Sequence, residues 1–125
     1  MVNGRVHVFG SSNVIRHTRR SAATRVMCST IVKAPLMRLA ARYLLVEKNR
    51  RGRAADGVAH FHLSNGARVE RINWLGDLSP KGIQQSAGIM INYLYRLSDI
   101  EENHEAYTGE GRVAASPAIT RLLKT

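Results

Sequence analysis

Residues 58–95 constrain the fold of this chain more than any other segment. Residues 58–63 are rich in β-branched and aromatic side chains and predict a strand. Asn65-Gly66 follows, and such a pair between apolar runs is among the strongest short hairpin signals. Residues 67–74 predict the returning strand. The sequence therefore predicts a small β-sheet with a hairpin near residues 58–74.

Amphipathic helices are predicted around this hairpin. Ser79 can cap a helix that Pro80 opens, and this helix is expected to run past Tyr95 to residue 97. A first helix is predicted from Pro35 to Gly52. Two shorter helices are expected over residues 98–109, from a capping box, and after Ser116-Pro117. Together these elements predict an α+β fold.

Composition limits the class of protein. The 125 residues fit one small domain, and the formal net charge is +10. Residues 1–53 hold 12 of the 19 basic residues and one acid, and residues 54–125 hold 7 basic and 8 acidic residues. The basicity therefore belongs to the first part of the chain. A non-catalytic basic module that binds anionic partners through residues 1–53 is the alternative function.

The compartment is predicted from the same residues. Cys28 is the single cysteine, so an intramolecular disulfide is impossible and a reducing, cytoplasmic location is expected. Residues 1–33 contain no acid and several Arg and Ser, which is also the composition of a mitochondrial transit peptide. No apolar run reaches the roughly 18 residues that a membrane span needs, so no membrane partner is expected.

Several long runs occur in an order that resembles the C-terminal part of malonyl-CoA decarboxylase catalytic domains. They are Pro35-Leu36-Met37-Arg38-Leu39, Phe61-His62-Leu63-Ser64-Asn65-Gly66-Ala67, Arg71-Ile72-Asn73-Trp74, Asn92-Tyr93-Leu94-Tyr95 and Glu101-Glu102-Asn103-His104-Glu105. The resemblance covers about residues 34–125, and residues 1–33 form a basic head without a recognised resemblance. It implies part of a domain of the acyl-CoA N-acetyltransferase type. The serine-bearing and phosphate-binding segments of the family have no counterpart in the head, so a truncated form is expected.

The resemblance implies a carboxy-lyase of fatty-acid metabolism that converts malonyl-CoA to acetyl-CoA and carbon dioxide. It makes His62 the catalytic histidine and Tyr95 an active-site tyrosine, and it places Asn65 with them among the substrate contacts. A histidine suits proton transfer because its pKa lies near working pH. No metal or organic cofactor is expected, because the thioester itself accepts the electrons. No nucleic-acid partner is expected, and a homo-oligomer is possible.

His60 departs from the family pattern, which has asparagine there. If residues 58–63 form a strand, His60 and His62 lie on one face at the spacing of metal ligands. The alternative is therefore a zinc site with His104, Asp77 or His7 as the third ligand. The basic cluster of Lys48, Arg50 and Arg51 has two interpretations: a solvated helix end, or an outer contact with the phosphates of CoA.

Overall fold

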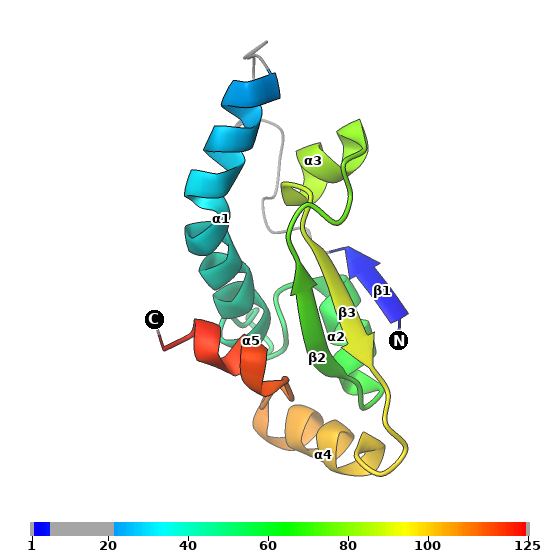
Figure 1. Ribbon diagram of the computed structural model, residues 1–125. Helices are drawn as coiled ribbons and strands as arrows, with labels where there is room; N and C mark the ends of the chain where they lie inside the picture. Colours follow the sequence, from blue (N-terminus) through cyan, green and yellow to red (C-terminus); the bar gives the residue numbers. More distant parts are fainter. Residues whose placement is uncertain (1, 6–21, 125) are drawn as a thin grey trace.

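The computed structural model describes residues 2–5 and 22–124, and these form an α+β fold (Figure 1). The described elements follow one another in the order β1 (Val2–Arg5), α1 (Ala22–Leu45), α2 (Gly57–Ser64), β2 (Arg68–Asn73), α3 (Pro80–Ser86), β3 (Met90–Leu94), α4 (Ile100–Glu110) and α5 (Pro117–Leu122). The predicted α+β class is confirmed. The boundaries of several predicted elements are not.

The described strands form one antiparallel sheet with β3 in the centre, between β1 and β2. β2 pairs with β3 so that Val69 lies opposite Tyr93 and Ile72 opposite Ile91. A bulge between Val69 and Arg71 adds one residue to β2. Because of this extra residue, Val69 and Ile72 face the same side of the sheet despite their odd spacing, and both are buried.

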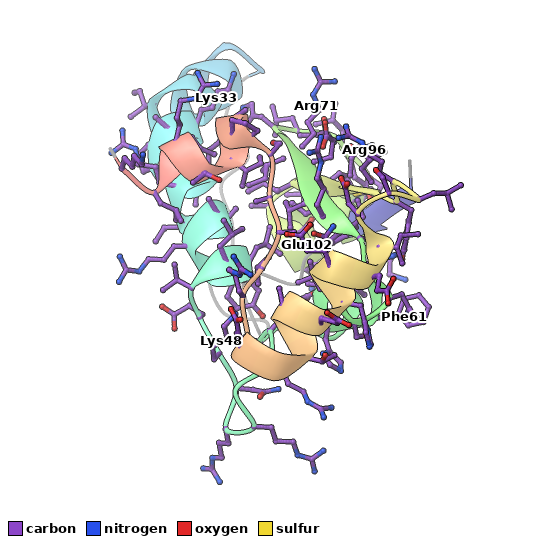
Figure 2. All side chains as sticks on the ribbon, turned by 90° about the horizontal axis from the view of Figure 1, so that it is seen from below. Lys33, Lys48, Phe61, Arg71, Arg96 and Glu102 are labelled. Atoms are coloured by element: carbon purple, nitrogen blue, oxygen red, sulfur yellow. The ribbon has the colours of Figure 1, made fainter. Side chains whose placement is uncertain are left out.

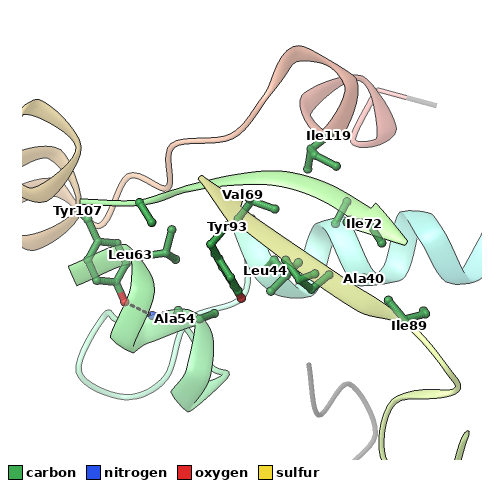
Figure 3. Close-up of a cluster of buried hydrophobic side chains, with 14 residues drawn as sticks. Ala40, Leu44, Ala54, Leu63, Val69, Ile72, Ile89, Tyr93, Tyr107 and Ile119 are labelled. Atoms are coloured by element: carbon green, nitrogen blue, oxygen red, sulfur yellow. Dashed lines mark hydrogen bonds between the residues drawn. The ribbon is translucent and has the colours of Figure 1, made fainter. Parts of the chain in front are cut away.

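The hydrophobic core lies between this face of the sheet and helices α1 and α2 (Figure 3). Leu44 from α1 and Leu63 from α2 pack in the same cluster as Tyr93 of β3. Ile119 of α5 closes the cluster beside Val69. Each fully buried aliphatic side chain of this kind stabilises the fold by about 1.5–3 kcal/mol. The core therefore fixes α2 and β3 against each other.

The predicted strand at residues 58–63 is wrong, because this segment is helix α2. Asp56 has extended backbone angles and its carboxylate accepts a hydrogen bond from the N–H of Ala59 at 2.8 Å, which caps the helix. The buried residues of α2 are Ala59, His62 and Leu63, the spacing of a helix face. The predicted hairpin near residues 58–74 is therefore replaced by a helix followed by strand β2.

The Asn-Gly pair ends helix α2 instead of turning a hairpin. Asn65 is the C-cap, and Gly66 follows with a φ angle of +89°. A β-carbon at Gly66 would lie 2.5 Å from the carbonyl oxygen of Ile100. Both the left-handed backbone and the close approach of α4 require glycine here.

The helix predicted over residues 80–97 is also wrong beyond its first two turns. Helix α3 begins at Pro80 with Ser79 as its cap, as predicted, but it ends at Ser86. Ala87 and Gly88 both have positive φ angles, 52° and 79°, and this pair of left-handed residues stops the helix. Strand β3 follows, and its residues alternate between half-buried and buried.

Helix α1 begins before Pro35, at Ala22, and it ends at Leu45. Residues 46–54 form a turn in which the Asn49 side chain accepts hydrogen bonds from the N–H groups of Arg51 and Arg53. The helix therefore stops well before Gly52, where it was predicted to end. The predicted boundary between residues 33 and 34 lies inside α1. No described helix is both long and apolar enough to cross a membrane.

Candidate active site

Helix α2 places the side chain of His62 against the sheet. The cap at Asp56 sets the start of the helix, and the buried face that includes His62 then turns toward β3. Only 7% of the His62 surface is exposed. The preceding residue, Phe61, is 61% exposed and projects outward from α2 (Figure 2). His62 therefore lies between the core and the exposed side chain of Phe61.

Strand β3 and the residue that follows it bring two tyrosines to this histidine. Tyr93 lies in β3 and Tyr95 lies just beyond its last residue, Leu94. Residues two apart along extended backbone point to the same side, whereas on the predicted helix they would point in different directions. Both tyrosine rings contact the imidazole of His62.

The contacts of His62 define its orientation. Its Nδ1 atom lies 2.7 Å from the hydroxyl oxygen of Tyr95, within hydrogen-bond distance. The ring of Tyr93 stacks on the imidazole with centroids 4.4 Å apart and an angle of 21° between the planes. Phe61 meets the imidazole edge-on at 5.3 Å. One ring nitrogen is thus bonded within the protein, and one ring face is covered.

Burial sets the charge state of this cluster. It lowers the pKa of His62 below its ordinary value, because a charged imidazolium loses hydration there. It raises the pKa of Tyr95 for the same reason. The pKa of Tyr93 is raised further, first by burial and then by the nearby charge of Asp56 and by Tyr95. At neutral pH the cluster therefore consists of a neutral imidazole and protonated phenols.

The structure thus brings together two of the three predicted site residues, His62 and Tyr95. The third, Asn65, is exposed at the end of α2, where its side-chain amide donates to the carbonyl oxygen of Phe61 at 2.7 Å. Its predicted contact with the substrate stays a prediction. Tyr93 was missed as a site residue, because residues 90–94 were assigned to a helix. The alternation of Ile91, Tyr93 and Tyr95 was the signal that could have revealed it.

The zinc alternative rested on a strand at residues 58–63, so its premise is wrong. On helix α2, His60 and His62 point in different directions and have different partners. Nδ1 of His60 lies 2.7 Å from the Tyr107 hydroxyl, and Nδ1 of His104 donates to the Ser64 carbonyl oxygen. In the described part of the chain, no three His, Cys, Asp or Glu residues are grouped so that they could hold a metal. His7 lies outside the described residues.

The described part of the basic region contributes to a separate cleft of about 450 Å³. Arg51 and Arg53 line it from the turn at residues 46–54, and His60 and Tyr107 line it from the two helices opposite. Lys48 lies at the base of this turn (Figure 2), and burial lowers its pKa. The predicted phosphate contact of the basic cluster, and the alternative of a basic binding module, stay predictions.

The chain is similar to known proteins over most of its length. A family model described as the malonyl-CoA decarboxylase C-terminal domain matches residues 10–125. The chain belongs to the malonyl-CoA decarboxylase family. The match begins well before residue 34, so it includes part of the segment for which no resemblance was predicted.

Curated relatives have the same name. The mitochondrial malonyl-CoA decarboxylase of Anser anser anser is 50% identical over 97 residues, which are 75% of this chain and 19% of the relative. The mitochondrial enzyme of Rattus norvegicus is 47% identical over 92 residues, which are 74% of this chain and 18% of the relative. The chain therefore spans about a fifth of the length of these relatives.

Solved structures agree with the fold. The crystal structure of malonyl-CoA decarboxylase from Agrobacterium vitis matches with a TM-score of 0.78 and 48% identity. It covers 82% of this chain, and the chain covers 25% of it. The structure from Rhodopseudomonas palustris matches with a TM-score of 0.77 and 47% identity, over 84% of this chain and 24% of that one. The arrangement of the elements is therefore that of a malonyl-CoA decarboxylase segment.

Proposed function

We propose that this chain forms the proton-donating part of a malonyl-CoA decarboxylase active site. The observation that supports the proposal is the buried pair of His62 and Tyr95, joined at 2.7 Å. A buried neutral histidine with one nitrogen bonded to the protein has one nitrogen left with which to act on a substrate. Family membership supplies the reaction, and the pair supplies the group that the reaction needs.

The decarboxylation reaction gives His62 and Tyr95 separate roles. In decarboxylation, the bond to the carboxylate breaks and its electron pair passes into the thioester as an enolate, while carbon dioxide leaves. His62 then donates its Nε2 proton to the α-carbon, which forms the new C–H bond, while its Nδ1 takes the hydroxyl proton of Tyr95, so that the imidazole stays neutral. Nε2 afterwards takes a proton from solvent as Nδ1 returns its own proton to Tyr95, which restores the pair. Tyr95 donates its O–H to Nδ1, which keeps the exchangeable proton on Nε2. The lowered pKa of His62 favours the neutral imidazole, in which Nδ1 can accept this hydrogen bond.

Other parts of the reaction need groups from the rest of a decarboxylase. The developing enolate oxygen needs hydrogen-bond donors, and the CoA phosphates need a binding segment. In our proposal these come from the serine-bearing upstream part of the family's catalytic domain, and the described sheet and helices complete a domain of the acyl-CoA N-acetyltransferase type. The small sheet, with β3 at its centre and helices on one face, supports this assignment.

We also propose a substrate, a cofactor requirement and a location for this protein. Malonyl-CoA is the substrate and acetyl-CoA the product, with neither metal nor organic cofactor, because the thioester carries the negative charge. The location is cytoplasmic or mitochondrial. Elemental analysis of untagged protein tests the cofactor statement, since zinc at one ion per chain would contradict it.

The function is tested by joining residues 22–125 to the upstream part of the Agrobacterium vitis decarboxylase. We expect this chimera to convert malonyl-CoA to acetyl-CoA. The substitution His62→Asn should lower kcat by roughly 10²–10⁴-fold, the usual contribution of a positioned general acid. His60→Asn is the matched control on the same helix and should leave kcat nearly unchanged. A chimera in which the two substitutions have equal effects would contradict the assignment of His62.

A further inference from the structure

We propose that Tyr93 is a positioning residue that holds the imidazole of His62 in its working orientation through the face of its ring. The inference rests on the proposed function of His62, but its geometry is independent of that function. Tyr93 does not correspond to any predicted site residue. It is fully buried in the central strand of the sheet and stacks on the imidazole.

The stacking geometry carries the inference. The two rings are 4.4 Å apart between centroids and inclined by 21°, which is close to parallel. Two further aromatic neighbours of His62 in the described part of the chain, Phe61 and Tyr95, meet it at 76° and 65°. An edge contact allows the imidazole to rotate about its last torsion, since that torsion is broad for a histidine. A ring stacked flat beneath it opposes this rotation, because tilting the imidazole would push it into the stacked ring.

The ring of Tyr93 is itself held rigidly. Tyr93 is fully buried, and its neighbours across the sheet are Val69 on β2 and Val2 on β1. Its ring packs within the cluster that includes Leu44, as Figure 3 shows. A side chain with no exposed surface in a packed core has few alternative rotamers. A catalytic group that is supported by a packed neighbour keeps its orientation better than one held by a single hydrogen bond.

The ring of Tyr93, and not its hydroxyl, acts on His62. The hydroxyl is buried and makes no hydrogen bond within the described part of the chain. Among the described residues, Tyr95 alone supplies a hydroxyl to Nδ1. The two tyrosines therefore have separate tasks on one side of β3: Tyr95 fixes the position of the proton, and Tyr93 fixes the plane of the ring. This division explains why two residues at strand spacing contact the same histidine.

The test uses nuclear magnetic resonance on the full 125-residue chain, so it requires no decarboxylase activity. The imidazole signals of His62 are assigned by their loss in His62→Asn. In the unaltered chain and in Tyr93→Phe, we expect these protons to be shifted upfield by the ring beneath them, and the ring nitrogens to show one tautomer. In Tyr93→Leu, the protons should move downfield toward the values of the other histidines, and the nitrogens should show a mixture of tautomers.

The control for general damage to the core is Ile91→Ala, which truncates another fully buried side chain of β3. It should leave the His62 signals near those of the unaltered chain. If Tyr93→Leu resembles Ile91→Ala in these signals, the ring of Tyr93 does not hold the imidazole of His62. If Tyr93→Phe loses the upfield shift as fully as Tyr93→Leu does, the hydroxyl and not the ring acts on His62. Either result overturns the inference, whereas an inactive chimera with normal His62 signals overturns only the proposed function.

Discussion

The hydroxyl oxygen of Tyr95 lies 2.7 Å from Nδ1 of His62, although 33 residues separate the two along the chain. The contact joins the end of strand β3 to the buried face of α2. It therefore depends on the tertiary fold, and disturbing either element should disturb it. The contribution of this hydrogen bond can be measured both as free energy of unfolding and as kcat.

The substitution Tyr95→Phe keeps the ring and removes the hydroxyl. The buried Nδ1 atom of His62 then loses its partner, and we expect the free energy of unfolding to fall by about 1–3 kcal/mol. Urea denaturation followed by circular dichroism measures this change. In the chimera, kcat should fall as well, because the proton on Nε2 is no longer enforced. An unchanged unfolding midpoint together with an unchanged kcat would show that the hydrogen bond has no role.

The burial of His62 also predicts how stability depends on pH. Its pKa in the folded protein is lowered below about 6.5, the ordinary value that it has when unfolded. Below that value the unfolded chain binds more protons at this residue than the folded one does. His62 therefore contributes stability that is complete above about pH 6.5 and is lost as the pH falls through the folded pKa.

Unfolding free energies measured across this pH range test the effect, with His62→Asn as the reference. The loss on acidification should be smaller in His62→Asn, because the variant has lost this titration while all the carboxylates remain. Equal pH dependence in the two proteins would mean that His62 is as well hydrated in the folded state as in the unfolded one.

Local sequence signals predicted the starts of α3 and α5 correctly, but they did not predict the starts of α1 and α2 or the strands. Ser79-Pro80 and Ser116-Pro117 open helices α3 and α5 where they were expected, since a proline at the first helical turn acts locally. The start of α2 had an equally local signal in the cap at Asp56. It was overlooked because the apolar run after it resembled a strand, and β-propensity depends on tertiary context.

The candidate site was predicted by resemblance more than by pattern. His62 and Tyr95 were both predicted as site residues, although each was assigned to the wrong kind of element. Their meeting depends on the left-handed residues Ala87 and Gly88, which end α3 and allow β3 to begin. An alanine with a positive φ angle has no strong sequence signal, because tertiary packing imposes it. The proposed role of Tyr93 depends on this strand, because extended backbone brings Tyr93 and Tyr95 to the same side.

The turn after α2 provides a stability test with a matched control. In Gly66→Ala, an alanine would have to adopt the left-handed backbone conformation of Gly66. Its methyl group would also lie 2.5 Å from the Ile100 carbonyl oxygen. We expect a loss of more than about 1–2 kcal/mol, the usual cost of that backbone alone. Gly57→Ala is the control, because nothing lies within 4 Å of its added β-carbon. Thermal unfolding of both variants checks the prediction, and equal midpoints would contradict it.

The Tyr107 hydroxyl joins three segments and should also be needed for stability. It accepts a hydrogen bond from the buried N–H of Ala54 at 2.9 Å and lies 2.7 Å from Nδ1 of His60. In Tyr107→Phe the N–H of Ala54 has lost its acceptor, and the unfolding free energy should fall by about 1–3 kcal/mol. Thr108→Ala is the control: it removes an exposed hydroxyl that bonds to the His104 carbonyl oxygen of its own helix, and should cost less than about 0.5 kcal/mol.

Urea denaturation compares the two variants, while the amide hydrogen exchange of Ala54 should accelerate in Tyr107→Phe alone. If Ala54 stays protected in that variant, the turn at residues 46–54 is held by other contacts and the hydroxyl is dispensable.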